Sequence, residues 1–198
     1  MGMRTLATAA VSLSALVAAS GAQAQSAVST SSFTVVGSAP KVCTISEPTL
    51  SSVNEVNIDS LDGSTLKISQ LTSTTTLSTL PASARVSFNA VCTFAHTVTI
   101  QSQNNGLWRD GSSQPMQNGF ADAVPWTGRI QWANIDRTFV AGAQNRQIVN
   151  FPFPIATPNA GQLLFDISIQ AGSTNSVANG PLLAGSYQDT IYITLEPQ

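Results

Sequence analysis

The chain has 198 residues and a formal net charge of −2, and only 9% of its residues are charged. This length suits one domain with a sizeable hydrophobic core. The lack of a basic patch or charge run argues against nucleic acid as a partner, and no run after residue 24 is apolar enough to span a membrane.

Residues 1–24 have the features of a secretory signal peptide. Arg4 precedes an apolar run from Thr5 to Ser20, and Ala22-Gln23-Ala24 forms a small-x-small cleavage site. Such a short apolar core is typical of a signal peptide rather than of a membrane span. We therefore expect export, with cleavage after Ala24.

A short alternating segment, residues 31–39, comes before the first cysteine. Phe33, Val35, Gly37 and Ala39 lie on one face of it. Alternation with a period of two predicts a β-strand. Taken alone, the pattern favours an ordinary first strand that pairs within its own sheet, and the alternative is a strand that pairs with another chain.

Two cysteines, Cys43 and Cys92, occur in a chain that we expect to be exported. Residues 42–45 and 85–92 alternate as strands, and each places its cysteine on the apolar face. An oxidising compartment favours a disulfide between them, with two buried free thiols as the alternative. The bridge would close a loop of about 50 residues, worth roughly 4 kcal/mol in the chain-entropy model.

The segment between the cysteines, residues 50–80, is the hardest to interpret. Leu66-Lys67-Ile68 predicts a short strand after the Asp62-Gly63 turn. Residues 69–79 are rich in Ser and Thr and fit either an edge strand or a loop.

After Cys92, further strands are predicted between turns. Residues 93–100 alternate as a continuation of the preceding strand, and residues 103–106 form a strong turn signal. Residues 107–119 are interpreted as a polar connection. Residues 124–132 predict a strand in spite of an internal proline and glycine.

Residues 148–155 predict an edge strand. Pro152 and Pro154 alternate with aromatic residues, and proline has no amide hydrogen to offer a neighbouring strand. Residues 163–170 alternate cleanly as another strand. Because no convincing amphipathic helix is present, these short strands and turns predict an all-β sandwich.

The last strand, within residues 184–195, is strictly alternating after an initial turn. The face expected to be buried is formed by Tyr187, Asp189, Ile191, Ile193 and Leu195. A terminal strand this apolar needs neighbours on both sides, because an unpaired edge promotes association. Its second neighbour is therefore expected to come from elsewhere.

Five of these features together resemble the spore coat protein U family, which includes pilins of the archaic chaperone–usher pathway. They are the strand before Cys43, the Cys43 and Cys92 pair, the strand at residues 97–102, Val124-Pro125-Trp126, and the ending Gly185-Ser186-Tyr187-Gln188-Asp189. The resemblance extends over nearly all of the chain after residue 24.

The resemblance implies an incomplete immunoglobulin-like β-sandwich that is completed by donor-strand exchange. Residues 25–40 would be an extension that carries the donor strand, and residues 41–198 would form the domain. Phe33 and Val35 would anchor the donor strand in the groove, and Gly37 would lie where the backbone of the donor strand must pass close to its neighbour. They would enter a groove lined in part by Ile191, Ile193 and Leu195 of a neighbouring subunit.

The resemblance also implies partners and a location. A periplasmic chaperone would fill the groove, and an outer-membrane usher would exchange its strand for that of another subunit. The product would be an extracellular, cell-surface fibre of one or several kinds of subunit. A disulfide from the first strand of the domain to a following strand is a further implication.

Residues suited to catalysis or cofactor binding are not evident. His96 is the only histidine, and it is best explained as a hydrogen-bonded histidine near a sheet end. The ten acidic residues are scattered singly, and no glycine-rich loop opens a helix. We therefore expect no enzymatic activity, no cofactor and no metal.

Two other functions remain as alternatives. Trp108, Trp126 and Trp132 are expected in the core and in subunit interfaces, but Trp108, on a predicted loop, is a candidate sugar platform. The chain would then be a secreted carbohydrate-binding or adhesive module. The second alternative is a coat protein that self-assembles without an usher.

Overall fold

A computed structural model describes residues 30–112, 119–176 and 179–198, and the predicted signal peptide, residues 1–24, lies outside them. Within these ranges the chain forms fourteen strands and no helix, so the fold is all-β as predicted. Residues up to Ser38 and residues from Ala39 onward form two separate units. No helix in the described ranges is long and apolar enough to cross a bilayer.

The described part of the first unit, residues 30–38, has no regular secondary structure. Phe33, Val35 and Val36 are 87%, 83% and 87% exposed. The ordinary first strand that the pattern alone favoured is therefore not formed. Apolar side chains on both faces of this segment are left in water.

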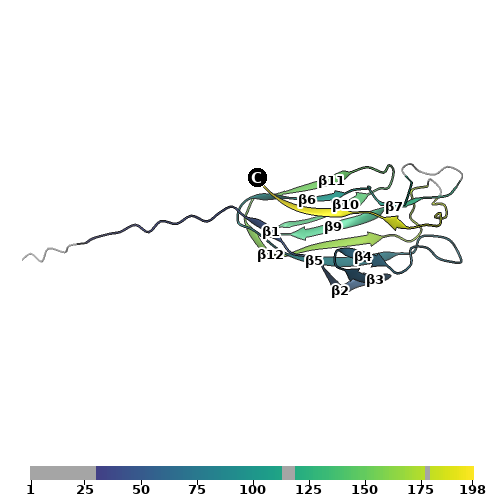
Figure 1. The fold of residues 1–198 in the computed structure, drawn as a ribbon, viewed down its shortest axis with the longest axis horizontal. Coiled ribbons are helices and arrows are strands. Elements are labelled where there is room, and N and C mark those ends of the chain that lie inside the picture. Colours follow the sequence, from purple (N-terminus) through teal and green to yellow (C-terminus); the bar gives the residue numbers. More distant parts are fainter. Residues whose placement is uncertain (1–29, 113–118, 177–178) are drawn as a thin grey trace, which may run out of the picture. The chain divides into compact units, whose positions relative to one another are not determined.

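The largest sheet contains six antiparallel strands, shown in Figure 1. β1 (Cys43–Ile45) and β2 (Thr49–Val56) both pair with β5 (Ala82–Cys92), which is followed by β12 (Asn159–Ile169), β9 (Trp126–Trp132) and β10 (Ile135–Ala141). β1 and β2 pair with different parts of β5, so together they form one interrupted edge.

A second sheet has the order β11 (Val149–Ile155), β6 (His96–Ser102) and β14 (Ile191–Pro197). Two small sheets complete the fold: β13 (Tyr187–Gln188), β7 (Leu107–Arg109) and β8 (Ala123–Val124), and the hairpin of β3 (Ile58–Asp62) with β4 (Thr65–Ile68). The hairpin confirms the strand that was predicted after the Asp62-Gly63 turn.

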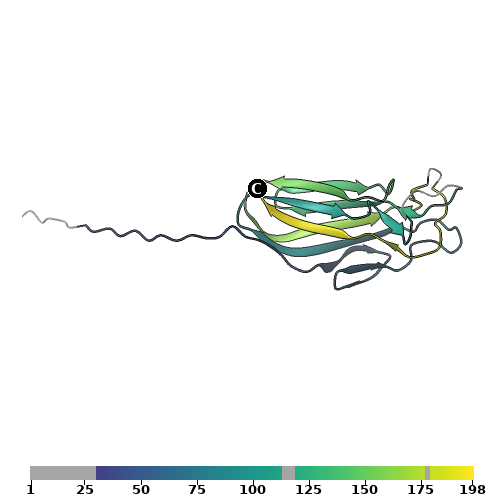
Figure 2. The ribbon, with the colours of Figure 1, turned by 45° about the horizontal axis from the view of Figure 1, so that its top comes forward.

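The two larger sheets share one hydrophobic core. Val98 and Ile100 of β6 pack in the same buried cluster as Trp126 and Ile130 of β9, and all four are at most 1% exposed. Figures 1 and 2 show the two layers of strands from two directions. Packing of two antiparallel sheets through their inner faces is the arrangement of a β-sandwich.

Three details of the predicted strands are wrong. Residues 93–100 do not continue β5, because the chain reverses at residues 93–95 before β6 and enters the other sheet. Residues 107–119 are not only a polar connection, since they contain β7. The final strand is not continuous: β13 pairs with β7, whereas β14 pairs with β6.

The disulfide between Cys43 and Cys92 is confirmed, and it joins directly opposed residues of β1 and β5. β1 has only three residues and lies at the edge of its sheet. Such a short strand makes few hydrogen bonds of its own, so the bridge fixes the start of the domain to its core.

Replacing both cysteines by serine is expected to lower the free energy of unfolding by about 4 kcal/mol, because the bridge spans 49 residues and restricts the unfolded chain. Urea denaturation of both proteins measures the difference. Thiol counting on the unreduced wild type is the control and should find no free thiol. A loss below about 1 kcal/mol would contradict the expectation.

Candidate functional site

In the part of the chain that the structure describes, no strand is hydrogen-bonded to the outer edge of β14. Gln103 donates its backbone N–H to the carbonyl of Thr190, and Gln198 donates to Ala95, which fixes the hydrogen-bonding phase of the β14–β6 ladder. Residues 192, 194 and 196 therefore bond to β6. In an antiparallel strand the intervening residues point their backbone groups the other way.

Those intervening residues are Ile191, Ile193 and Leu195. Among the described residues, no backbone group pairs with their outward N–H and C=O groups. Their side chains are partly buried and pack against the core. The same three residues thus present both an unsatisfied strand edge and an apolar surface.

A groove of about 1500 Å³ lies beside this edge. Ile191 and Ile193 form part of one side, Ile45 and Phe88 lie on the other, and Trp126 is in the lining. Leu195 packs against the core but does not line the groove. A volume above the roughly 300–1,000 Å³ of small-molecule sites suits an extended chain segment.

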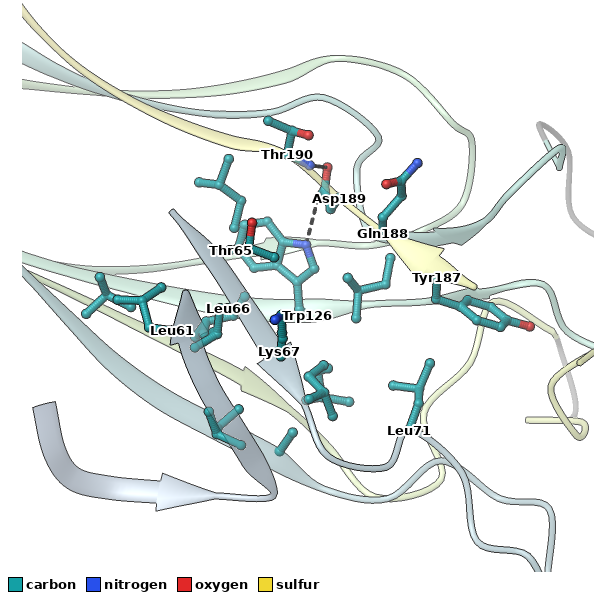
Figure 3. A pocket seen from close by; sticks show the side chains of 18 of the residues that line it. Leu61, Thr65, Leu66, Lys67, Leu71, Trp126, Tyr187, Gln188, Asp189 and Thr190 are labelled. Carbon is teal, nitrogen blue, oxygen red and sulfur yellow. Dashed lines mark hydrogen bonds between the residues drawn. The ribbon is translucent and has the colours of Figure 1, made fainter. Parts of the chain in front are cut away.

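The β3–β4 hairpin forms a further wall of the groove, as Figure 3 shows. Leu61 and Leu66 of the hairpin line it. Asn57 holds the base of the hairpin: its amide donates to the carbonyls of Gln70 (2.6 Å) and Pro81 (3.2 Å), and its side-chain oxygen accepts from Gln70 N at 3.1 Å. The second strand of this wall was predicted, but its partner β3 and its place beside the groove were not, because residues 50–80 carry little periodic signal.

The opposite side of the sandwich is closed by aromatic rings. Phe139 of β10 packs against Phe151 and Phe153 of β11, with ring centroids 4.4 and 5.8 Å apart. Phe165 lies 6.2 Å from Phe139 in the same cluster. The sandwich is therefore closed between β10 and β11, in contrast to its open side between β14 and β1.

The free edge of β11 differs from that of β14. Pro152 and Pro154 lie opposite Thr99 and Thr97 of β6, at the positions whose backbone points away from β6. Proline has no N–H, so these two positions offer no donor to another strand. The prediction of an edge strand here is confirmed, and β14 differs in having N–H donors at three successive outward positions, 191, 193 and 195.

Asp189 joins β14 to the core at one end of the groove, as Figure 3 shows for two of its bonds. Its carboxylate accepts hydrogen bonds from Ser102 Oγ (2.6 Å) and Trp126 Nε1 (2.9 Å). It also accepts from three backbone amides, those of Asn104, Gly106 and Thr190, at 3.0, 3.3 and 2.8 Å. Hydrogen bonds to an ionised group are stronger than neutral ones, so Asp189 is a major anchor.

Tyr187 lies near Asp189 in the Gly-Ser-Tyr-Gln-Asp sequence and has a separate role. Its hydroxyl donates to the carbonyl of Leu183 at 2.6 Å, which holds the turn before β13. Burial raises the pKa of Tyr187 to about 12, because the phenolate would lose contact with water. The hydroxyl is therefore neutral and a donor over the physiological range.

His96 is buried and fully hydrogen-bonded. Trp132 Nε1 donates to His96 Nε2 at 2.8 Å, so Nε2 is an acceptor and the ring proton resides on Nδ1, 2.9 Å from the carbonyl of Phe94. This agrees with the predicted structural role of His96. In the described ranges, no three His, Cys, Asp or Glu side chains are close enough to hold a metal ion.

The expected burial of the tryptophans is confirmed, and the alternative of Trp108 as an exposed sugar platform on a loop is wrong. Trp108 belongs to β7 and is 0% exposed, in a small cluster with Ala123 and Ala143. Trp126 and Trp132 are also buried, at 1% and 2%. None of the three tryptophans therefore presents a ring to a sugar.

The groove brings together several of the residues singled out in the sequence. Tyr187, Asp189, Ile191 and Ile193 line it. Residues 31–39 belong largely to the other unit and are not part of this lining. The contribution of Trp126 was missed, although its position in a Val-Pro-Trp sequence was noted.

No protein-family model, curated protein or solved structure matches this chain.

Proposed function

We propose that the chain is a structural subunit of a secreted surface fibre, polymerised by insertion of the N-terminal strand of one subunit into the groove of the next. The domain is then an incomplete immunoglobulin-like sandwich that lacks one strand beside β14. The proposal applies the resemblance to chaperone–usher pilins to this chain. It includes export, a periplasmic chaperone that fills the groove, and an outer-membrane usher.

One observation carries the proposal: β14 has an unpaired edge with apolar side chains facing an open groove. A peptide that adds to a sheet edge gains main-chain hydrogen bonds, and its alternate side chains fill pockets below. Three N–H and three C=O groups of Ile191, Ile193 and Leu195 are available for such bonds.

The exposed N-terminal segment has the matching chemistry. Residues 31–39 contain no charge, and Phe33 and Val35 alternate on one face. Each of these side chains is more than 80% exposed, and its burial would contribute about 1.5–3 kcal/mol. Val36 lies on the opposite face and would be covered only by other contacts in the fibre.

Phe33→Arg together with Val35→Arg tests the proposal. Two charges without partners in an apolar groove cost several kcal/mol, so polymerisation should be lost. The variant should still form a complex with its chaperone, because the altered residues lie outside the folded domain. Co-purification with the chaperone and light scattering of released subunits measure the two properties.

The matched control is Ser32→Arg with Thr34→Arg, which adds the same charge to the opposite face of the segment. This variant should polymerise. Polymers from the Phe33/Val35 variant, or loss of its chaperone complex while the wild type is captured normally, would contradict the proposed donor strand.

A further inference from the structure

The outward face of the β11–β6–β14 sheet carries a trough that crosses the strands. In its middle row, Thr99 of β6 lies between Pro152 of β11 and Thr194 of β14. All three side chains are short. Longer side chains lie on both sides of this row, and together with it they enclose a surface hollow of about 530 Å³.

One bank of the trough consists of Asn150, Gln101 and Tyr192, which occupy the next row of the same three strands. Tyr192 is 52% exposed, so one side of its ring is in contact with water. Glu196 stands on the other bank. An aromatic ring, two amides, two hydroxyls and one carboxylate therefore surround a common hollow.

The amides of this bank are held in place by a hydrogen-bonded relay. Gln103 Nε2 donates to Gln101 Oε1 at 2.6 Å, and Gln101 Nε2 donates to Asn150 Oδ1 at 2.8 Å. The relay fixes how the three amides are oriented relative to one another. Within the described ranges, the Asn150 amide nitrogen and the hydroxyls of Thr99 and Thr194 have no protein partner, so they remain available to a ligand.

From this arrangement we propose that the trough binds a neutral oligosaccharide. Sugar hydroxyls both donate and accept hydrogen bonds, which matches amide, hydroxyl and carboxylate groups together. The apolar face of a sugar ring suits a half-exposed aromatic side chain, which combines apolar area with a polar tip. Glu196 disfavours acidic polysaccharides because like charges repel.

Two other ligand classes fit the trough less well. None of the described residues that line it is Lys or Arg, whereas binding of a nucleic acid backbone depends on such cations. A peptide would need backbone groups or apolar pockets, but β6 is bonded on both sides and the floor is formed by short side chains.

This site does not rest on the proposed polymerisation. Tyr192 and Thr194 alternate with Ile191 and Ile193 along β14 and so lie on the opposite face of the sheet, although Tyr192 also borders the groove. A strand added to the edge of β14 would leave the trough on the outer face. A fibre of such subunits would carry the site at every repeat, which increases its avidity for a polymeric ligand.

Calorimetry of the purified chain with neutral oligosaccharides of four to six units, from gluco-, manno- and N-acetylglucosamine series, tests the inference. Saturable binding to at least one series is expected. Tyr192→Ala and Asn150→Ala should each weaken it at least tenfold, whereas Tyr192→Phe should retain most of it. Thr138→Ala, on the exposed face of β10, is the matched control and should not change it.

Near-ultraviolet circular dichroism, which reports on the buried tryptophans, verifies that each variant is folded. Absence of binding by the folded wild type to every series overturns the proposal. Binding that survives both Tyr192→Ala and Asn150→Ala also overturns it, as does binding of a peptide library at this face without binding of any sugar.

Discussion

Asp189→Ala is expected to lower the free energy of unfolding by about 3–5 kcal/mol, at the upper end of single substitutions. The variant loses a carboxylate that accepts five hydrogen bonds. Trp126 Nε1, in a residue only 1% exposed, would be left without its acceptor, and an unsatisfied buried donor is costly. Urea denaturation monitored by tryptophan fluorescence measures this loss.

Asp189→Asn separates the hydrogen bonds from the side-chain volume. Its single carbonyl oxygen can retain only part of the network, so an intermediate loss is expected. Asp136→Ala is the control: Asp136 pairs with Arg129 on the exposed face of the large sheet, where solvent screens the interaction, and little change is expected. Similar stabilities for Asp189→Ala and the wild type would show that the network is not an anchor.

Ile193→Pro is expected to abolish polymerisation while the domain still folds. The N–H of Ile193 points away from β6, so proline removes no hydrogen bond of the existing ladder. It removes a donor from the middle of the free edge and places a ring where an incoming strand would pair. Circular dichroism measures folding, and light scattering measures assembly.

Two controls make the result specific to the edge. Ile193→Ala removes most of the side chain but keeps the N–H, so it should slow assembly without abolishing it. Asn150→Pro places the same ring at an outward position of β11, the opposite edge of the same sheet. That variant should assemble normally. Assembly by Ile193→Pro at the wild-type rate would rule out β14 as the acceptor edge.

The N-terminal and β14 substitutions test different halves of one contact. The Phe33→Arg/Val35→Arg variant cannot donate its strand but should still accept one from a wild-type subunit. The Ile193→Pro variant cannot accept a strand but should still donate its own. Mixing the two variants is therefore expected to yield pairs that do not extend. Recovery of long polymers from the mixture would contradict the hypothesis that each subunit carries both the donor strand and the acceptor edge.

Local patterns in the sequence predicted much of the sandwich. The alternation in residues 85–92 and 163–170 is a property of each strand alone, because successive side chains of a strand face opposite sides. The proline pair at 152 and 154 identified an edge without any knowledge of the neighbouring strand. The disulfide followed from two cysteines in a chain expected to be exported.

Long-range pairing determined the rest. Trp108 is buried because β7 lies between β8 and β13, and β13 is almost 80 residues further along the chain. β2 was missed because its pairing with β5 shifts register between Ser51 and Val56, where Asn54 has a positive φ, and no alternating apolar pattern marks it. No window of neighbouring residues contains this information.

Asp189 illustrates the division between what the local sequence predicts and what only the tertiary structure determines. Alternation placed it on the face of the last strand expected to be buried, and its bonds to Ser102 and Trp126 agree with this. Its bond to Trp126, 63 positions away, depends on β9 and β14 facing each other across the core. Alternation by itself determined which face of each strand is apolar, and the last strand was expected to lack a neighbour. Only the tertiary structure decided which strand pairs with β14 and which of its two edges stays open, because an edge is defined by the strands that do not pair with it.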